Sequence, residues 1–212
     1  MKKETKEIKI KGLFEKFGEF DSWEEINRAA AAQKEQGDDE AVKTIAKENG
    51  IDEMDAQDFL DGALSELCTP MTAAIGKLDA EAEALQLPMM MQMWKDTING
   101  MFASSDGDQL MIGVRRKGRR LAELFGKMIV ECSKSRVNTP QPIVDYARQI
   151  DGSIPQTLPM ADLSKARFME LVREYYLDGT EKAAIEETGE VAPVQPENEE
   201  ATDEPEEAGD DE

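Results

Sequence analysis

Apolar residues in the N-terminal third of this chain recur at helical spacing, in short runs with clear stops. Ser22 followed by Glu25 three residues later is the signature of a capping box at a helix start. Gly37 and Gly50 stand where the first and second runs end, and glycine is common just after a helix. The pattern therefore predicts three short amphipathic helices within residues 19–62.

Longer apolar runs follow, again at helical spacing. A helix begins at Pro70 and ends before Pro88, because proline fits the first turn of a helix but not its interior. The methionine-rich residues 89–102 predict a helix that packs mainly in the core. Residues 164–177 predict a last amphipathic helix, and only residues 7–11 alternate like a short strand. The predicted fold class is mainly α, a compact multi-helix domain.

A single helical phase also runs through residues 108–134. Its apolar members are Leu110, Val114, Leu121, Phe125, Met128 and Cys132. We expect one long amphipathic helix here, with Gly118 turned inward to allow the close approach of another helix. Its basic residues would form an exposed cluster made of Arg115, Arg116, Lys117, Arg119, Arg120 and Lys127.

Charge is segregated along the chain, whose formal net charge is −21 at pH 7. Residues 18–62 carry fourteen acidic and four basic side chains, whereas residues 108–137 carry eight basic and three acidic ones. Residues 181–212 hold fourteen acids and one lysine, a composition typical of a disordered segment. We expect an N-terminal segment over 1–18, an acidic short-helix lobe over 19–68, a helical core over 69–179 and a disordered acidic tail over 180–212.

The basic cluster allows three interpretations. Arginine and lysine neutralise phosphates, so the cluster is a candidate nucleic-acid site, although its face carries no aromatic residue for stacking. It is equally a candidate site for the acidic surface of a protein partner. In the third interpretation the cluster is an ordinary polar face, held by internal partners such as the acidic lobe or tail.

The acidic lobe contains the run TIAKENGIDEMDAQDFLDG, whose spacing resembles the first half of a helix-turn-helix motif. Its second helix would present five carboxylates, from Asp52, Glu53, Asp55, Asp58 and Asp61. DNA phosphates would repel that helix, so direct reading of DNA is not expected. Carboxylates can stand where phosphates would, so the lobe is a candidate site for a basic protein surface. The alternative interpretation is that these acids are ordinary solvated helix faces.

The sequence lacks the residues of most enzyme classes. It contains no histidine, the commonest general base and zinc ligand, and no glycine-rich phosphate loop or nucleophile elbow. Cys68 and Cys132 lie in separate apolar patterns and are interpreted as buried structural thiols. We expect no catalysis, no cofactor and no metal.

No apolar run approaches the ~20 residues that a membrane span needs. The first residues include lysines but lack the uncharged apolar core of a secretory signal. We therefore expect a cytoplasmic protein that makes no membrane contact.

The runs EFDSWEEINRAAAAQKEQGD, IAKENGID, DAQDFLDG and CTPMTAAIGKL resemble small acidic proteins carried by mobile elements of Gram-positive gut bacteria. The resemblance covers roughly residues 11–100. It implies an anti-CRISPR role, as in broad-spectrum inhibitors of the nuclease Cas9, and it assigns no individual functional residue.

Two functions are predicted from these observations, and a structural or assembly protein that forms a stable oligomer is the third alternative. The first is a non-enzymatic binding protein of a mobile element or phage that inhibits a nucleic-acid-handling enzyme, with Cas9 as the specific candidate partner. The alternative is a DNA-binding accessory or regulatory protein of a mobile element, acting through the basic cluster.

Overall fold

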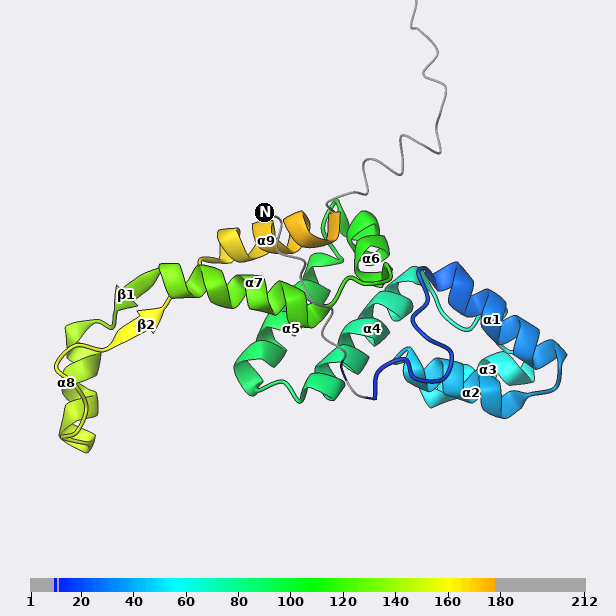
Figure 1. The fold of residues 1–212 in the computed structure, drawn as a ribbon, viewed down its shortest axis with the longest axis horizontal. Helices are drawn as coiled ribbons and strands as arrows, with labels where there is room; N and C mark the ends of the chain where they lie inside the picture. The colour runs from blue at the N-terminus through cyan, green and yellow to red at the C-terminus, as the bar shows by residue number, and fades with distance from the viewer. Residues whose placement is uncertain (1–9, 11, 178–212) are drawn as a thin grey trace, which may run out of the picture.

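α-Helices dominate the part of the chain that this computed structural model describes, which is residue 10 and residues 12–177. In chain order the elements are α1 (Trp23–Glu35), α2 (Asp39–Glu48), α3 (Glu53–Asp61), α4 (Pro70–Leu85), α5 (Met89–Met101), α6 (Gly107–Arg115), α7 (Leu121–Lys134), β1 (Arg136–Asn138), α8 (Gln141–Ile150), β2 (Pro159–Ala161) and α9 (Lys165–Leu177) (Figure 1). The predicted mainly α class is confirmed. The predicted tail at 180–212 and, apart from Ile10, the predicted strand at 7–11 lie outside the described residues.

Helices α1, α2 and α3 begin at the side chains that the sequence offers as caps. Ser22, Asp38 and Asp52 each accept a hydrogen bond from a backbone N–H in the helix that follows. The three helices enclose a small apolar cluster. Its buried members include Ile26, Ala30, Val42, Ile45, Ala46 and Phe59. The prediction of three short helices is confirmed.

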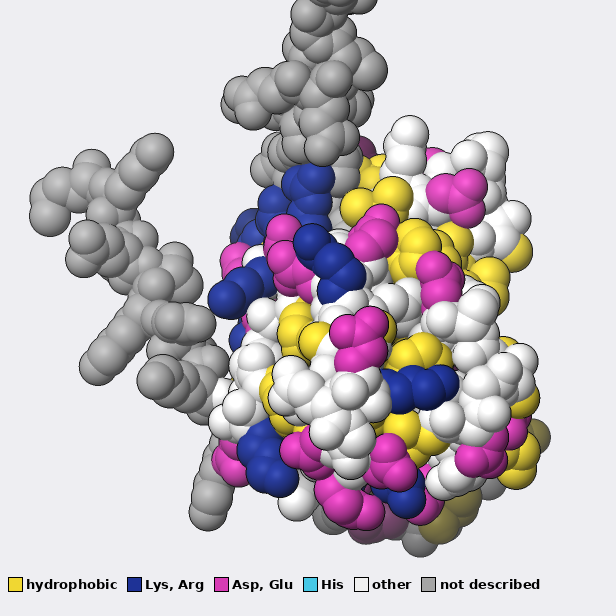
Figure 2. Space-filling model, turned by 90° about the vertical axis from the view of Figure 1, so that its right-hand side faces the viewer, with side chains coloured by type: hydrophobic (Ala, Val, Ile, Leu, Met, Phe, Trp, Pro, Cys, Tyr) yellow, Lys and Arg dark blue, Asp and Glu magenta, His cyan; other side chains and the backbone are white. Residues whose placement is uncertain are grey.

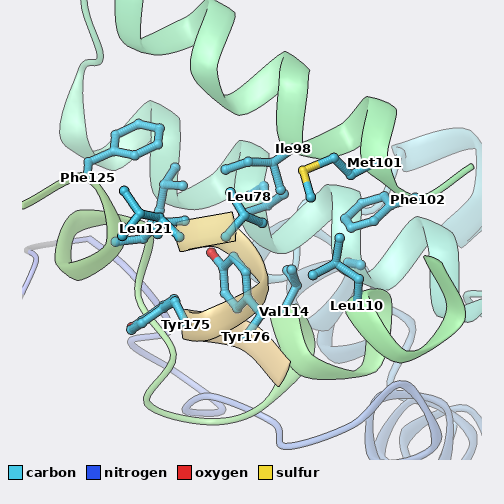
Figure 3. Packing of buried hydrophobic residues seen from close by; sticks show 14 of the residues in the cluster. Leu78, Ile98, Met101, Phe102, Leu110, Val114, Leu121, Phe125, Tyr175 and Tyr176 are labelled. Carbon is cyan, nitrogen blue, oxygen red and sulfur yellow. The ribbon is translucent and has the colours of Figure 1, made fainter. Parts of the chain in front are cut away.

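Helix α4 belongs to two apolar clusters. Ala73 packs with the α1–α3 cluster, and the next residue, Ala74, packs with a larger cluster formed by α4, α5, α6, α7 and α9. Figure 3 shows Leu78 of α4, Val114 of α6 and Tyr176 of α9 close together in the larger cluster. Both cysteines are buried free thiols, as predicted.

The predicted helix over 108–134 is wrong, because the structure contains two helices in its place. Helix α6 ends at Arg115 and α7 starts at Leu121. Gly118 between them has a φ of +79°, a left-handed conformation that glycine adopts without steric cost. The spacing of apolar residues could not show this break, because residues 115–120 contain no apolar side chain and the helical phase is the same on both sides of them.

The prediction that the methionine-rich helix α5 lies mainly in the core is confirmed only in part. Only Ile98 and Met101 of this helix are buried, while Met89, Met90 and Met93 are exposed. Met91 and Trp94 are partly buried against the larger cluster, and the Trp94 ring meets Phe125 and Phe168 edge to face. The helix therefore contacts the cluster along much of its length, while three methionines near its start lie on the surface.

Helix α8 and the strands β1 and β2 form an arm that projects from the rest of the molecule (Figure 1). The strands pair antiparallel, with Arg136 opposite Ala161. Of α8 only Val144 is buried. Nowhere in the described residues is a helix both long and apolar enough to cross a bilayer.

The α2–α3 turn touches α4 through two glycines. A Cβ on Gly50 would lie 2.1 Å from the Gly76 carbonyl oxygen, and one on Gly76 would lie 2.3 Å from the Asn49 carbonyl oxygen. Backbone therefore meets backbone at this point, and no side chain fits between the two elements.

Replacing Gly76 with Ala should destabilise the protein by about 3 kcal/mol, the upper end of the cost of overpacking a filled site. The cause is the backbone contact at 2.3 Å, which cannot yield as a flexible side chain would. Urea unfolding measures the difference. Gly100→Ala in α5 is the matched control, because its new Cβ meets nothing within 4 Å. Equal stabilities of the two variants would show that the backbone contact is not tight.

Candidate functional site

An acidic groove lies where α2, the start of α3 and α4 meet. Its volume is about 730 Å³, and its floor is made of small and apolar residues such as Ala46, Ile51 and Ala80. The charged residues that line it are Glu40, Lys43, Lys47, Asp52, Glu53, Asp79 and Glu83. Five carboxylates against two lysines give the groove a net negative charge.

The five acids predicted as one binding surface are divided by the structure. Asp52 and Glu53 are exposed and line the groove. Asp55 and Asp58 are half-buried, and Asp61, at the far end of α3, accepts a hydrogen bond from Gln57. The part of the predicted surface that forms a cavity is therefore the N-terminal end of α3, completed by acids of α2 and α4.

Figure 2 shows the end of the molecule that carries α1–α3. Acidic side chains are spread over this face and are interrupted by lysine, arginine and apolar side chains. The lobe thus presents an acidic but mixed surface rather than a continuous sheet of negative charge.

The basic run forms a turn between α6 and α7 rather than a helix face. We call residues Arg115–Arg120 the basic turn. Arg115 is 1% exposed, so its predicted place in an exposed binding cluster is wrong. Arg116, Arg119 and Arg120 are half-buried, and only Lys117 and the more distant Lys127 are exposed.

Arg115 joins α6 to the N-terminal residues. Its Nη2 donates hydrogen bonds to the Asn49 side-chain oxygen at 2.6 Å and to the Phe20 carbonyl at 3.3 Å. Burial lowers the pKa of Arg115 to about 10. Within the described part of the chain, its Nε and Nη1 atoms have no hydrogen-bond partner.

Glu19 is the acid on which the cations converge. One of its oxygens lies 2.7 Å from Lys77 Nζ, and the other lies 2.8 Å from Arg120 Nη2 and accepts the Gly118 N–H at 3.0 Å. The side chains of Glu19 and Lys77 are 4% and 1% exposed, so this is a buried ion pair. Lys77 Nζ also donates to the Arg116 carbonyl at 2.6 Å. The N-terminal segment, α4 and the basic turn therefore meet at one carboxylate.

Glu81, one turn along α4 from Lys77, holds the start of α7. Its carboxylate accepts the Leu121 N–H at 2.5 Å and lies 3.5 Å from Arg120 Nη1. A negative charge at a helix N-terminus is favourable, because unpaired N–H groups point outward there. Burial raises the pKa of Glu81 and lowers that of Lys77, and their mutual attraction offsets part of both shifts.

Tyr175 of α9 completes the network. Its hydroxyl accepts the Arg120 N–H at 2.7 Å and donates to Glu123 at 3.0 Å. The cationic groups of Arg119 and Lys127 lie 5.3 and 4.4 Å from the centre of its ring. Most predicted basic binding residues are thus engaged by internal partners, which favours the third interpretation of the basic cluster.

Sequence reasoning missed Glu19, Lys77, Glu81 and Tyr175 as members of this network. A weak signal existed for two of them, because Lys77 and Glu81 are four residues apart on one side of α4 and flank its apolar stripe. Two opposite charges at such positions can be buried as a pair. Among the residues that the structure places, no three side chains of the metal-binding types come together.

The comparisons with known proteins place the chain in no group. No family model matches its sequence, no curated protein matches it, and no solved structure matches its fold.

Replacing Lys77 with Met should destabilise the protein by about 3–5 kcal/mol, because Glu19 would remain buried without its closest cation. In the double variant K77M/E19Q the charge of Glu19 is removed together with its cation, and Glu81 keeps Arg120 at 3.5 Å, so the loss should be smaller than the sum of the single losses. Urea unfolding of both single variants and the double variant measures this coupling.

Lys134→Met is the surface control, since Lys134 pairs with Glu131 while 66% exposed. Its loss should stay within about 1 kcal/mol. Additive losses in the K77M and E19Q cycle would mean that the two residues do not interact.

Proposed function

We propose that this protein is a non-enzymatic binder that inhibits a nucleic-acid-handling enzyme by placing its acidic groove against a basic surface of that enzyme. The single observation that carries the proposal is the groove itself, where Asp52 and Glu53 lie with three further carboxylates around an apolar floor. A basic segment that enters it would find both charge neutralisation and apolar contact.

Cas9 is the specific candidate partner. It holds its guide–target heteroduplex in a positively charged channel, which is the kind of surface that carboxylates in place of phosphates would suit. The net charge of −21 would also speed the encounter with such a channel at low salt. The activity would belong to the bacterial cytoplasm, where Cas9 acts.

The alternative of a DNA-binding accessory protein receives less support. This function would need the basic cluster to contact DNA. However, Arg115 is buried, and Arg120 is paired with Glu19 and Glu81. Cations that already neutralise internal carboxylates release few counterions from DNA, so the expected affinity for DNA is low.

The test is cleavage of a target plasmid by purified Cas9 and its guide RNA, with increasing amounts of this protein. We expect inhibition that weakens as salt rises. The variant E53K/E83K, which reverses two exposed acids of the groove, should raise the half-inhibitory concentration at least about tenfold, equivalent to 1.4 kcal/mol.

The matched control is D145K/E170K, which makes the same charge change at exposed acids of α8 and α9, outside the groove. It should inhibit like the unchanged protein. Full cleavage by several Cas9 orthologues at high inhibitor excess would refute the Cas9 assignment. Equal losses in the two variants would refute the role of the groove.

A further inference from the structure

The basic turn has the backbone geometry of an anion site. The Arg119 N–H bonds to the Arg116 carbonyl at 3.3 Å, which closes a four-residue turn with Gly118 in its third position. The N–H groups of Lys117 and Gly118 both point away from the turn and toward carboxylates, those of Asp21 and Glu19. Successive amides arranged in this way bind anionic oxygens in many phosphate sites.

Cationic side chains complete the same site. Lys77 Nζ and Arg120 Nη2 lie 2.7 and 2.8 Å from the Glu19 carboxylate that also accepts the Gly118 N–H. Two cations and a backbone amide around one oxyanion are the donors that proteins use for phosphate groups.

The acids that fill this site come from a segment without helix or strand. We call residues 12–21 the strap; it precedes α1 and crosses the basic turn. At its C-terminal end the strap is anchored, because the Phe20 carbonyl accepts a hydrogen bond from Arg115 and the Phe20 ring packs against the α1–α3 cluster. Its N-terminal part has few other described contacts. The Lys16 and Phe17 N–H groups bond to Glu48, and the Phe14 ring lies within 6 Å of the Arg115 and Arg120 guanidinium groups.

The strap leaves part of the donor capacity unused. Arg115 is 1% exposed, and two of its three guanidinium nitrogens have no hydrogen-bond partner among the described residues. A backbone phosphate of a nucleic acid, like a carboxylate, offers two anionic oxygens and one charge, but it is one of a regular series of such charges along the strand.

We propose that the basic turn and Lys77 form a phosphate-binding site for nucleic acid, and that Glu19 and Asp21 of the strap occupy it as an internal substitute. Displacement of the strap frees the Lys117 and Gly118 amides and the cations around Glu19 for backbone phosphates. The site shares no residue with the lining of the acidic groove and does not depend on the proposed inhibitor function.

The internal acids compete strongly because they are tethered. A covalently linked ligand acts at an effective concentration of order mM. The apparent affinity for an external nucleic acid is the intrinsic affinity of the site multiplied by the fraction of molecules in which the strap is displaced. The protein as it stands should therefore bind nucleic acid weakly, and loss of the two internal charges should reveal the site.

The test is fluorescence anisotropy with a labelled single-stranded DNA of about 20 nucleotides at about 50 mM salt, where phosphate contacts are strong. The variant E19Q/D21N should bind at least about tenfold more tightly than the unchanged protein, with an affinity that falls steeply as salt rises. The control D145N/E170Q removes the same two charges elsewhere on the surface and should bind like the unchanged protein. Adding K117E/R119E to E19Q/D21N should abolish the gain.

A folded E19Q/D21N variant that binds no more tightly than the control would overturn the proposal. Binding of inorganic tripolyphosphate without binding of DNA would overturn the assignment to nucleic acid. If the variant does not fold, amide hydrogen exchange of the unchanged protein decides the matter. Excess DNA should speed exchange in residues 12–21, and unchanged exchange there at saturating DNA would overturn the proposal.

Discussion

The buried ion cluster around Glu19 is the constraint on which the arrangement of the described chain depends. Lys77 and Arg120 reach the carboxylate of Glu19 from α4 and from the basic turn, and Glu81 holds the start of α7 beside them. Burying such charges is costly, and the cost is recovered only when all partners are in place. The position of the strap, the break between α6 and α7, and the contact of α1–α3 with α4 are therefore determined together.

Local features of the sequence were sufficient to predict the helices of the N-terminal lobe. Ser22, Gly37 and Gly50 act within a few residues of themselves, and the structure uses them as the sequence indicates. The break at Gly118 could not be predicted in this way. Its cause is the meeting of the turn with Glu19 and Asp21, about one hundred residues earlier, and helical periodicity contains no information about such a contact.

The candidate site was predicted in part, for the same reason. Asp52 and Glu53 were predicted because they belong to the acidic second helix of the run that resembles a helix-turn-helix. Asp79 and Glu83, on the other wall of the groove, belong to a helix that the sequence alone does not bring near α3. The burial of Arg115 was missed because a run of arginines normally indicates a solvent-exposed surface. In the structure Arg115 is buried and donates hydrogen bonds to the Asn49 side chain and the Phe20 carbonyl.

The two apolar clusters share α4 through the adjacent residues Ala73 and Ala74. One continuous helix runs through both clusters, and the close contact of Gly50 with Gly76 joins the smaller cluster to it. Unfolding of α4 would remove packing partners from both clusters at the same time. The clusters should therefore behave as one cooperative unit, so that a ligand bound at the acidic groove would also protect the larger cluster against unfolding.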